Sequence, residues 1–336
     1  MGAFIKSTSY YLPERIFTND DFFEIFPESI PNKHNLQKLG IKIRHIVNEN
    51  ETASDLAVKA ALKLFIEHSI KQNEIDFVLF CAQEFDHYTP TTACIIHQKL
   101  GLNSSCGAMD YNLGCSGFVY GLGIAKGLIQ SLGCRNVLLL TSSTLTKTFH
   151  KLDKSSRFIF GDGAAATLIT ANKSNKIGEF VYGTDGSRAD KIIIKDGGAR
   201  NKLTDASFID FTDDFGNITN DASFYMNGSS IFNFGLKTVP SLVEETLTKN
   251  SISKNDIDLF IFHQANLFLI ETIAKKLVIP PKKLFNFMEL TGNTVSSSIP
   301  IVLAEAINMK KIKSGDKVLI CGFGTGLSWC ATILEI

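Results

Sequence analysis

The chain has 336 residues, a formal net charge of zero and 44% hydrophobic against 20% charged residues, which suffices for a large core and excludes a disordered chain. Balanced charge without a dense Lys/Arg run gives no indication of nucleic-acid binding, although it leaves room for a local basic patch facing an acidic protein partner. The N-terminus lacks the features of a secretory signal, and the apolar runs are too short to span a bilayer. The seven cysteines form no CxxC pair, which argues against a zinc ribbon. We therefore expect a cytoplasmic protein with reduced thiols.

The N-terminal part of the chain predicts an alternation of helices and buried strands. Residues 54–68 carry Leu and Ala at helical spacing between Lys and Glu, with Thr52 or Ser54 as the cap. Residues 69–83 and 133–140 each begin as a polar turn and continue as an apolar run, which is typical of a strand buried on both faces. Residues 117–132, between them, are apolar enough for a buried helix.

The chain also repeats itself. Three pairs of segments match at corresponding positions: Ser69–Gln83 with Ser251–Ala265, Gly133–Leu140 with Ser314–Cys321, and Phe160–Gly163 with Phe323–Gly326. The two segments of the first pair share six residue types at the same offsets: Ser, Ile, Asn, Ile, Asp and Phe. The two segments of the third pair are followed by the similar sequences ATLI and ATIL. The duplication indicates two similar structural units in one chain.

The two units are expected to be residues 1–172 and 177–336, joined by a polar linker at 172–176. Helices predicted at 268–277 and 296–309 are the C-terminal counterparts of the N-terminal helices. Alternating buried strands and helices favour parallel sheets built from right-handed crossovers.

Cys115 lies in the segment NLGCSGF, directly before the helix predicted at 117–132. The positive end of the helix dipole and free backbone N–H groups would lower its pKa and favour the thiolate. Gly114 permits a strained turn that exposes the sulfur. A buried structural cysteine at a helix start is the alternative, and the local sequence leaves both open.

His263 and Asn293 are the candidate partners of this cysteine. His263 ends the repeated strand, at the carboxyl end where α/β proteins build their sites, although a lone histidine is more often a core residue. Asn293 precedes the helix predicted at 296–309, the repeat counterpart of the helix behind Cys115. The duplication therefore predicts that Cys115 and Asn293 face one another at a pseudo-twofold centre, with His263 nearby.

These three residue types fit one reaction. A thiolate can accept an acyl group from a thioester. Histidine and asparagine N–H groups can stabilise the enolate formed when a malonyl group loses carbon dioxide, and the carbanion can then attack the acyl-cysteine. The glycine-rich segment 322–326 could supply backbone N–H groups for the second oxyanion, or it could be a simple tight turn between strands.

The remaining motifs predict no cofactor and no metal. Gly121-x-Gly123 lies inside a helical pattern, which argues against a dinucleotide fingerprint. Three isolated histidines lack ligand spacing: His45, His87 and His150. Residues 196–225, rich in Gly, Asp and Asn, are interpreted as a long surface excursion that could line a substrate entrance.

With these residues in place, the chain resembles the type III β-ketoacyl-acyl-carrier-protein synthases over essentially its whole length. Nine segments agree in order and spacing: Thr8–Pro13, Leu39–Ile46, Thr91–Gly101, Gly114–Phe118, Phe160–Ala164, His263–Leu267, Lys275–Leu277, Gly292–Thr294 and Gly322–Trp329. The resemblance implies a thiolase-like α/β fold, with two pseudo-symmetric βαβ-rich halves in a five-layered α-β-α-β-α arrangement. It also implies a homodimer in which the loop around residue 89 reaches the partner's pocket.

The resemblance assigns catalysis to Cys115, His263 and Asn293, and the acyl oxyanion to the backbone N–H groups of Cys115 and Thr325. The implied reaction is a decarboxylative Claisen condensation of an acyl thioester with a malonyl thioester, in fatty-acid or related lipid biosynthesis. Acyl carrier protein is the implied partner, and candidate contacts for this acidic carrier are Lys275 and Lys276.

Several family positions differ in this chain. Family members that use coenzyme A stack its adenine ring between a Trp and an Arg, and this chain has His34 and Lys38 at those positions. Two further family arginines, near the mouth of the substrate tunnel, correspond to Lys154 and Phe268. These changes weaken the case for a coenzyme A primer and leave a primer on acyl carrier protein open. Thr89 replaces a bulkier Phe, which predicts a roomier acyl pocket. Some relatives use a Glu immediately before this proline as the base for condensation, and that Glu is absent here because Thr89 precedes Pro90.

Two other functions remain open on the sequence. The first is an acyltransferase that passes the acyl group from Cys115 to an amine or hydroxyl, although plain transfer does not need both His263 and Asn293. The second is a catalytically silent subunit that only shapes a partner's pocket, against which the intact Cys–His–Asn set argues.

Overall fold

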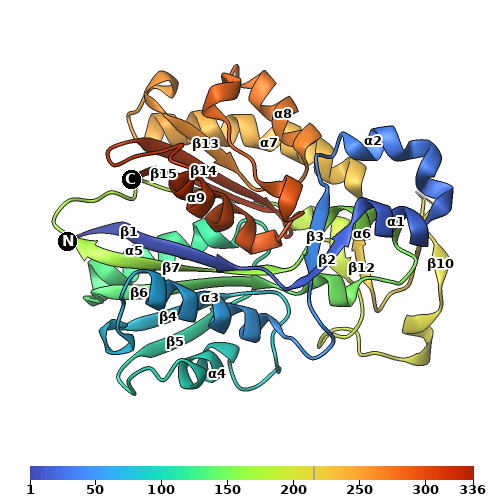
Figure 1. Cartoon of the computed structure of the whole chain (residues 1–336), viewed down its shortest axis with the longest axis horizontal. Helices are drawn as coiled ribbons and strands as arrows, with labels where there is room; N and C mark the ends of the chain where they lie inside the picture. Colours follow the sequence, from blue (N-terminus) through green and yellow to red (C-terminus); the bar gives the residue numbers. More distant parts are fainter. Residues whose placement is uncertain (215) are drawn as a thin grey trace.

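The computed structural model describes residues 1–214 and 216–336, so Phe215, inside the predicted excursion, lies outside the described residues. Two β-sheets lie one above the other, with helices between them and on both outer faces (Figure 1). The layers follow in the order α-β-α-β-α, as the fold-class prediction requires.

The first sheet has five strands in the order β1-β7-β6-β4-β5. Its strands are Gly2–Tyr11 (β1), Phe77–Cys81 (β4), Gly107–Tyr111 (β5), Asn136–Ser143 (β6) and Gly163–Asn172 (β7). Strand β4 pairs in parallel with β5 and β6, whereas β7 runs antiparallel to both β6 and β1.

The second sheet has four strands in the order β13-β14-β15-β8. Its strands are Val181–Thr184 (β8), Leu259–Phe262 (β13), Lys317–Gly324 (β14) and Ser328–Glu335 (β15). Strand β13 is parallel to β14, and β15 is antiparallel to both of its neighbours.

The prediction of purely parallel sheets is therefore wrong for one strand in each sheet. These strands, β7 and β15, contain the matching ATLI and ATIL segments, so the repeat itself is preserved. Strand β15 follows β14 after only residues 325–327. A parallel connection needs a crossover of a dozen or more residues, so a turn this short reverses the chain.

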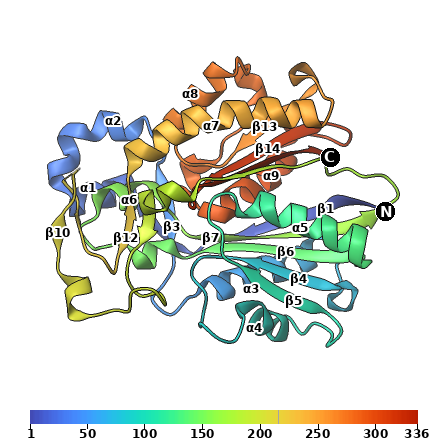
Figure 2. The same ribbon diagram turned by 180° about the vertical axis from the view of Figure 1, so that it is seen from behind.

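Six helices cover the two sheets. They are Ala53–Glu67 (α3) and Thr92–Lys99 (α4) outside the first sheet, Gly117–Leu132 (α5) and Ser298–Asn308 (α9) between the sheets, and Gly228–Lys249 (α7) and Leu267–Lys276 (α8) outside the second (Figure 2). Thr52, not Ser54, is the N-cap of α3, through a capping box with Asp55. The predicted helix 296–309 begins as a short 3₁₀ turn, Val295–Ser297, before α9 starts.

Smaller elements gather beside the two sheets. They are Arg15–Thr18 (β2), Asn19–Ile25 (α1), Lys33–Gln37 (α2), Ile43–Ile46 (β3), Lys154–Ile159 (α6), Ile192–Ile194 (β9), Phe211–Thr212 (β10), Ile218–Thr219 (β11) and Phe224–Met226 (β12). Strand β12 ends the predicted excursion and pairs with β9, which brings this part of the chain to the side of the candidate active site.

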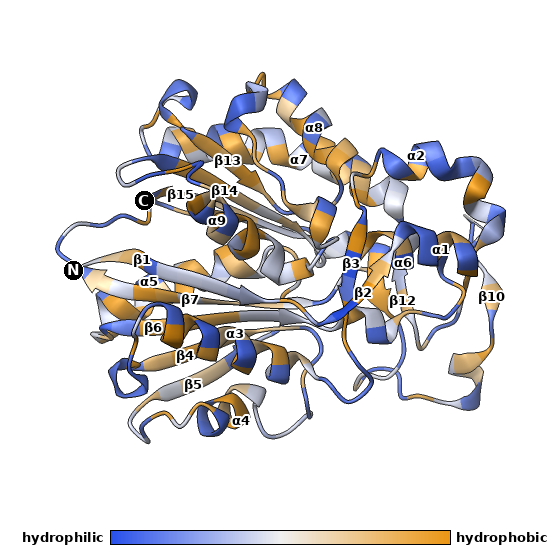
Figure 3. Ribbon diagram, in the orientation of Figure 1, coloured by the Kyte–Doolittle hydropathy of each residue, from blue (hydrophilic) through white to orange (hydrophobic). Residues whose placement is uncertain are grey.

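The two sheets share an apolar core around α5. Phe118 and Leu122 of this helix belong to the same buried cluster as Ile261 and Ile320 of the second sheet. Figure 3 shows apolar residues along the central strands and hydrophilic residues on the outer helices. Burying each large apolar side chain contributes about 1.5–3 kcal/mol, so α5 holds the sheets together and fixes its own N-terminus between them. Among residues 1–214 and 216–336, no helix is long and apolar enough to cross a membrane.

Candidate active site

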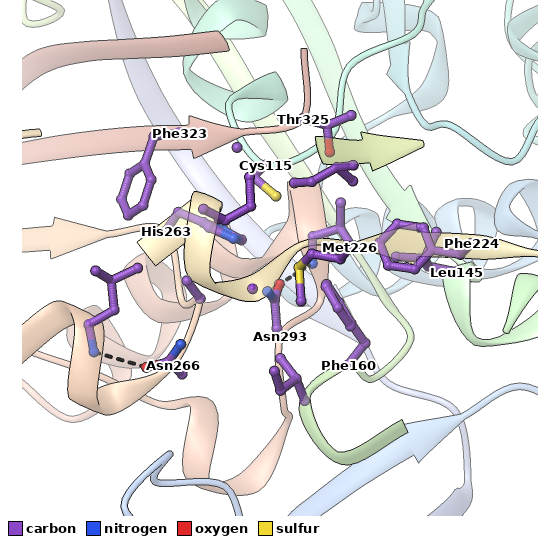
Figure 4. Close-up of a pocket in the computed structure, with 18 of the residues that line it drawn as sticks. Cys115, Leu145, Phe160, Phe224, Met226, His263, Asn266, Asn293, Phe323 and Thr325 are labelled. Atoms are coloured by element: carbon purple, nitrogen blue, oxygen red, sulfur yellow. Dashed lines mark hydrogen bonds between the residues drawn. The ribbon is translucent and has the colours of Figure 1, made fainter. Parts of the chain in front are cut away.

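One cavity brings together the three residues that the repeat pattern predicted to meet. Cys115, His263 and Asn293 all line it, and they come from the start of α5, the end of β13 and the segment before α9. Figure 4 shows the three side chains converging on this space. All three are almost completely buried, and most of the surrounding wall is apolar.

Cys115 lies two residues before α5 and is pressed against the second sheet. A Cβ atom on Gly324 of β14 would lie 2.7 Å from Cys115 Sγ, so only glycine lets this strand pass so close to the nucleophile. The Thr325 and Cys115 backbone N–H groups both favour the ionised sulfur. Burial is the larger effect, however, and raises the pKa of Cys115 to about 11. The sequence-based expectation of a lowered pKa is therefore wrong for the unliganded site, because it considered the helix end and not the depth of the cavity.

This raised pKa leads to a testable pH dependence. Thiolate is the reactive form, so alkylation of Cys115 by iodoacetamide should rise about tenfold per pH unit from about pH 7 to about pH 10. The rate would be followed by intact-protein mass spectrometry, with Cys115→Ala as the background. A plateau already reached at neutral pH would contradict the burial argument.

His263 is held in one orientation by the start of α9. Its Nδ1 lies 2.7 Å from Ser298 Oγ, and the backbone N–H of Gln264 donates to the same hydroxyl. The ring edge packs against Phe323. Burial lowers the pKa of His263 to about 3, so the imidazole is neutral at physiological pH. When Ser298 donates its hydroxyl hydrogen to Nδ1, the Nε2–H is left to donate into the cavity.

Asn293 is oriented by its own loop. Its Oδ1 accepts a hydrogen bond of 2.9 Å from the backbone N–H of Val295, which leaves the Nδ2 hydrogens for another acceptor. The backbone of Asn293 is tied to the segment before β7, since its N–H donates to Ile159 O and its C=O accepts from Gly161 N–H. The loop that carries Asn293 is thus anchored to the first half of the chain.

The other predicted substrate contacts lie outside this cavity, except Thr325, which lines it. Lys38 follows α2 on the surface, and Lys154 begins α6 and pairs with Glu28. Thr89 lies in an exposed loop and does not line the cavity of its own chain.

Three predicted contacts lie on α8. Phe268 is 51% exposed and stacks on Phe232, which lines the cavity, so the two rings mark its mouth. Lys275 and Lys276 lie in the last turn of α8, and Lys276 donates to the Leu236 carbonyl of α7. Lys276 is thereby held on the surface, at the opposite end of α8 from Phe268.

The sequence reasoning missed two residues at the site. Ser298 fixes the His263 ring, and Gln83 lines the cavity next to Cys115. The repeat contained a signal for Gln83, because it follows the strand that matches the one ending at His263. Within the described part of the chain, no group of three or more His, Cys, Asp or Glu side chains could hold a metal ion.

Comparisons with known proteins show the family to which this chain is related. Residues 109–186 match the family described as 3-oxoacyl-[acyl-carrier-protein (ACP)] synthase III, and residues 247–336 match its C-terminal family. A curated β-ketoacyl-[acyl-carrier-protein] synthase III from Xanthomonas euvesicatoria is 35% identical over 98% of this chain and 97% of its own length.

Solved structures give the same result. A crystal structure of a 3-oxoacyl-(acyl-carrier-protein) synthase III superimposes with a TM-score of 0.97 at 40% identity, covering all of both chains. A 3-oxoacyl-(acyl-carrier-protein) synthase from Burkholderia xenovorans LB400 has a TM-score of 0.91 at 31% identity, covering 100% of this chain and 94% of the other.

The fold and the buried Cys–His–Asn constellation define a thiolase-fold condensing enzyme of the acyltransferase class. Within that class, the chain belongs to the β-ketoacyl-acyl-carrier-protein synthase III family. Its reaction is the condensation of an acyl thioester with a malonyl thioester.

Proposed function

We propose that Cys115 carries the acyl group, and that His263 and Asn293 activate a malonyl group on acyl carrier protein for decarboxylative condensation. The product is a β-ketoacyl thioester for fatty-acid or related lipid synthesis. The observation that carries this proposal is the convergence of one thiol and two oriented N–H donors on a single buried cavity.

In the first half-reaction, the sulfur of Cys115 attacks the carbonyl carbon of the incoming thioester. The bond from that carbon to the carrier's sulfur breaks, and the proton of Cys115 leaves with the departing thiol. The backbone N–H groups of Cys115 and Thr325, which favour negative charge on the sulfur, are suited to stabilise the oxyanion of this step. Because the free thiol has a raised pKa, we expect its proton to be lost during attack and not beforehand.

In the second half-reaction, the malonyl thioester oxygen accepts hydrogen bonds from His263 Nε2–H and Asn293 Nδ2–H. Loss of carbon dioxide then leaves an enolate whose charge both donors stabilise in a site that excludes water. The enolate carbon attacks the acyl-cysteine, the carbon–sulfur bond to Cys115 breaks, and the thiolate takes a proton from solvent. A neutral imidazole is required here, which agrees with the lowered pKa of His263.

Acyl carrier protein is the proposed donor because of the surface around the cavity mouth. Lys275 and Lys276 lie in the last turn of α8, and the Phe232–Phe268 pair lies at the first turn of the same helix, roughly 10 Å away along its axis. Lysines there can pair with an acidic carrier while its phosphopantetheine arm passes the two rings. Lys38, which follows α2, and Lys154, the first residue of α6, are further candidate contacts.

We also propose a cytoplasmic homodimer. All seven cysteines are free thiols, which fits a reducing compartment. Strand β5 forms an edge of the first sheet, and the loop holding Thr89 is exposed, so a second copy could pair along β5 and place this loop at its cavity. Analytical ultracentrifugation should find a species of twice the 37.0 kDa chain mass at micromolar concentration. A persistent monomer with full activity would contradict the homodimer.

Carbon dioxide release tests the proposed reaction against the acyltransferase alternative. Acyl-enzyme would be prepared, freed of excess thioester, and mixed either with malonyl carrier protein or with amine and alcohol acceptors. Condensation predicts one carbon dioxide and one β-ketoacyl product for each acyl group discharged. Discharge onto an amine or alcohol without carbon dioxide would replace the proposal by plain acyl transfer.

A further inference from the structure

The catalytic cavity continues past Cys115 into a second, larger chamber of about 600 Å³. The two spaces share five lining residues: Gln83, Leu145, Ile192, Phe224 and Thr325. Since Cys115 lines the first space and Thr325 belongs to both, an acyl group attached to the sulfur can extend into the second chamber.

One wall of this passage is polar and begins directly beside the nucleophile. A Cβ atom on Gly114 would lie 2.8 Å from Gln83 Oε1 and 3.0 Å from Thr325 Oγ1, so the Gln83 carboxamide rests against the residue that precedes Cys115. Within residues 1–214 and 216–336, the Gln83 side chain has no hydrogen-bond partner. Its amide therefore has unused donors and acceptors at the inner end of the passage.

Glu84 also lines this chamber, but its carboxylate is turned away from the open space. Its Oε2 accepts a hydrogen bond of 3.2 Å from the backbone N–H of Thr144, but its buried Oε1 has no partner among the described residues. Burial and the nearby Asp162 raise the pKa of Glu84 to about 7. Glu84 therefore backs the chamber wall and offers no free group to an acyl chain.

Of the five residues shared by the two spaces, the three besides Gln83 and Thr325 are apolar: Leu145, Ile192 and Phe224. The outer part of the second chamber is polar, with Asp86, His87, Asn112 and Thr148 in its wall. A saturated acyl chain would cover the apolar wall but would leave the carboxamide of Gln83 without a hydrogen-bond partner. An unsatisfied buried polar group costs roughly 1–3 kcal/mol. A site built to hydrogen-bond a hydroxyl group therefore discriminates strongly against analogues without that hydroxyl. This discrimination is larger than the one an apolar site makes against an extra methylene.

We propose that the acyl group accepted by Cys115 carries a hydroxyl substituent, which is recognised by Gln83. This inference rests on the proposed condensing function and names its primer class. In a homodimer, the partner's loop would close the outer end of the chamber and leave Gln83 at the inner end.

The test uses two acyl donors of equal chain length, butyryl and 3-hydroxybutyryl thioesters on the same carrier. The rate of Cys115 acylation by each donor is measured as the gain in mass of the full-length protein. The hydroxyacyl donor should give a kcat/KM at least about tenfold higher. Gln83→Met, which is nearly isosteric and cannot donate a hydrogen bond, should lose most of this preference, because hydroxybutyrylation slows more than butyrylation. Glu84→Gln, which keeps one donor and one acceptor group, should retain most of it. Cys94→Ser, on the exposed surface of α4 and outside both cavities, is the matched control.

Equal rates for the two donors in the native protein, or an unchanged preference in Gln83→Met, would overturn the inference. If both donors acylate Cys115 equally and malonyl carrier protein then discharges them, only the primer class is wrong and the condensing function stands. If no acyl thioester acylates Cys115, the proposed function fails together with this inference.

Discussion

Replacing Cys115 by alanine is expected to abolish the acyl-enzyme and to lower product formation by at least about a thousandfold. The sulfur is the attacking atom, and no other cysteine lines the catalytic cavity among the described residues. Alanine removes one atom from a buried site without adding bulk, so the fold should be kept, which circular dichroism and melting temperature would check. Product yield would be measured with acyl and malonyl thioesters.

The matched control for this substitution is Cys94→Ala, which removes an exposed thiol on α4. It should acylate and condense at the native rate. Retention of acylation in Cys115→Ala would mean that another nucleophile carries the acyl group, and retention of product yield would favour the silent-subunit hypothesis.

Substitution of Asn293 or His263 should separate the two halves of the reaction. Asn293→Asp keeps an oxygen to accept from Val295 N–H but removes the N–H donor, so condensation should fall about 10²–10³-fold while acylation of Cys115 continues. His263→Ala should have the same signature, because it removes the second donor to the enolate. Acylation would be read from intact mass, and condensation from carbon dioxide release.

An equal loss of both halves in Asn293→Asp would contradict this division of roles and would indicate that the residue shapes the whole cavity. Loss of acylation alone in His263→Ala would instead assign the imidazole to deprotonation of Cys115.

The internal repeat was the main source of correct predictions. It placed Cys115 and Asn293 before equivalent helices, and α5 and α9 do contribute to one buried cluster between the sheets, with both residues on one cavity. The helix at 117–132 was predicted with its observed bounds because its apolar run ends at Gly133, which adopts a left-handed conformation suited to a helix C-terminus.

Strand direction could not be predicted from hydrophobic patterning. A strand buried on both faces has the same apolar run whether its neighbours are parallel or antiparallel, so β7 and β15 were not distinguished from the central strands. The short turn between β14 and β15 was the available signal, since it cannot hold a crossover.

The pKa of Cys115 and the roles of Gln83 and Ser298 depend on tertiary packing. A helix start in sequence predicts a lowered thiol pKa, but the approach of Gly324 and the closure of the cavity around the sulfur raise it. Ser298 reaches His263 from a helix 35 residues away, a contact that no local pattern encodes.

The most direct test of the account is the intact mass of the protein, first after incubation with acyl thioesters and then after addition of malonyl carrier protein. The account predicts a mass gain of one acyl group that is absent in Cys115→Ala, followed by return to the free mass with release of carbon dioxide. An acyl group that stays on the protein when malonyl carrier protein is added, or that appears equally in Cys115→Ala, would contradict it.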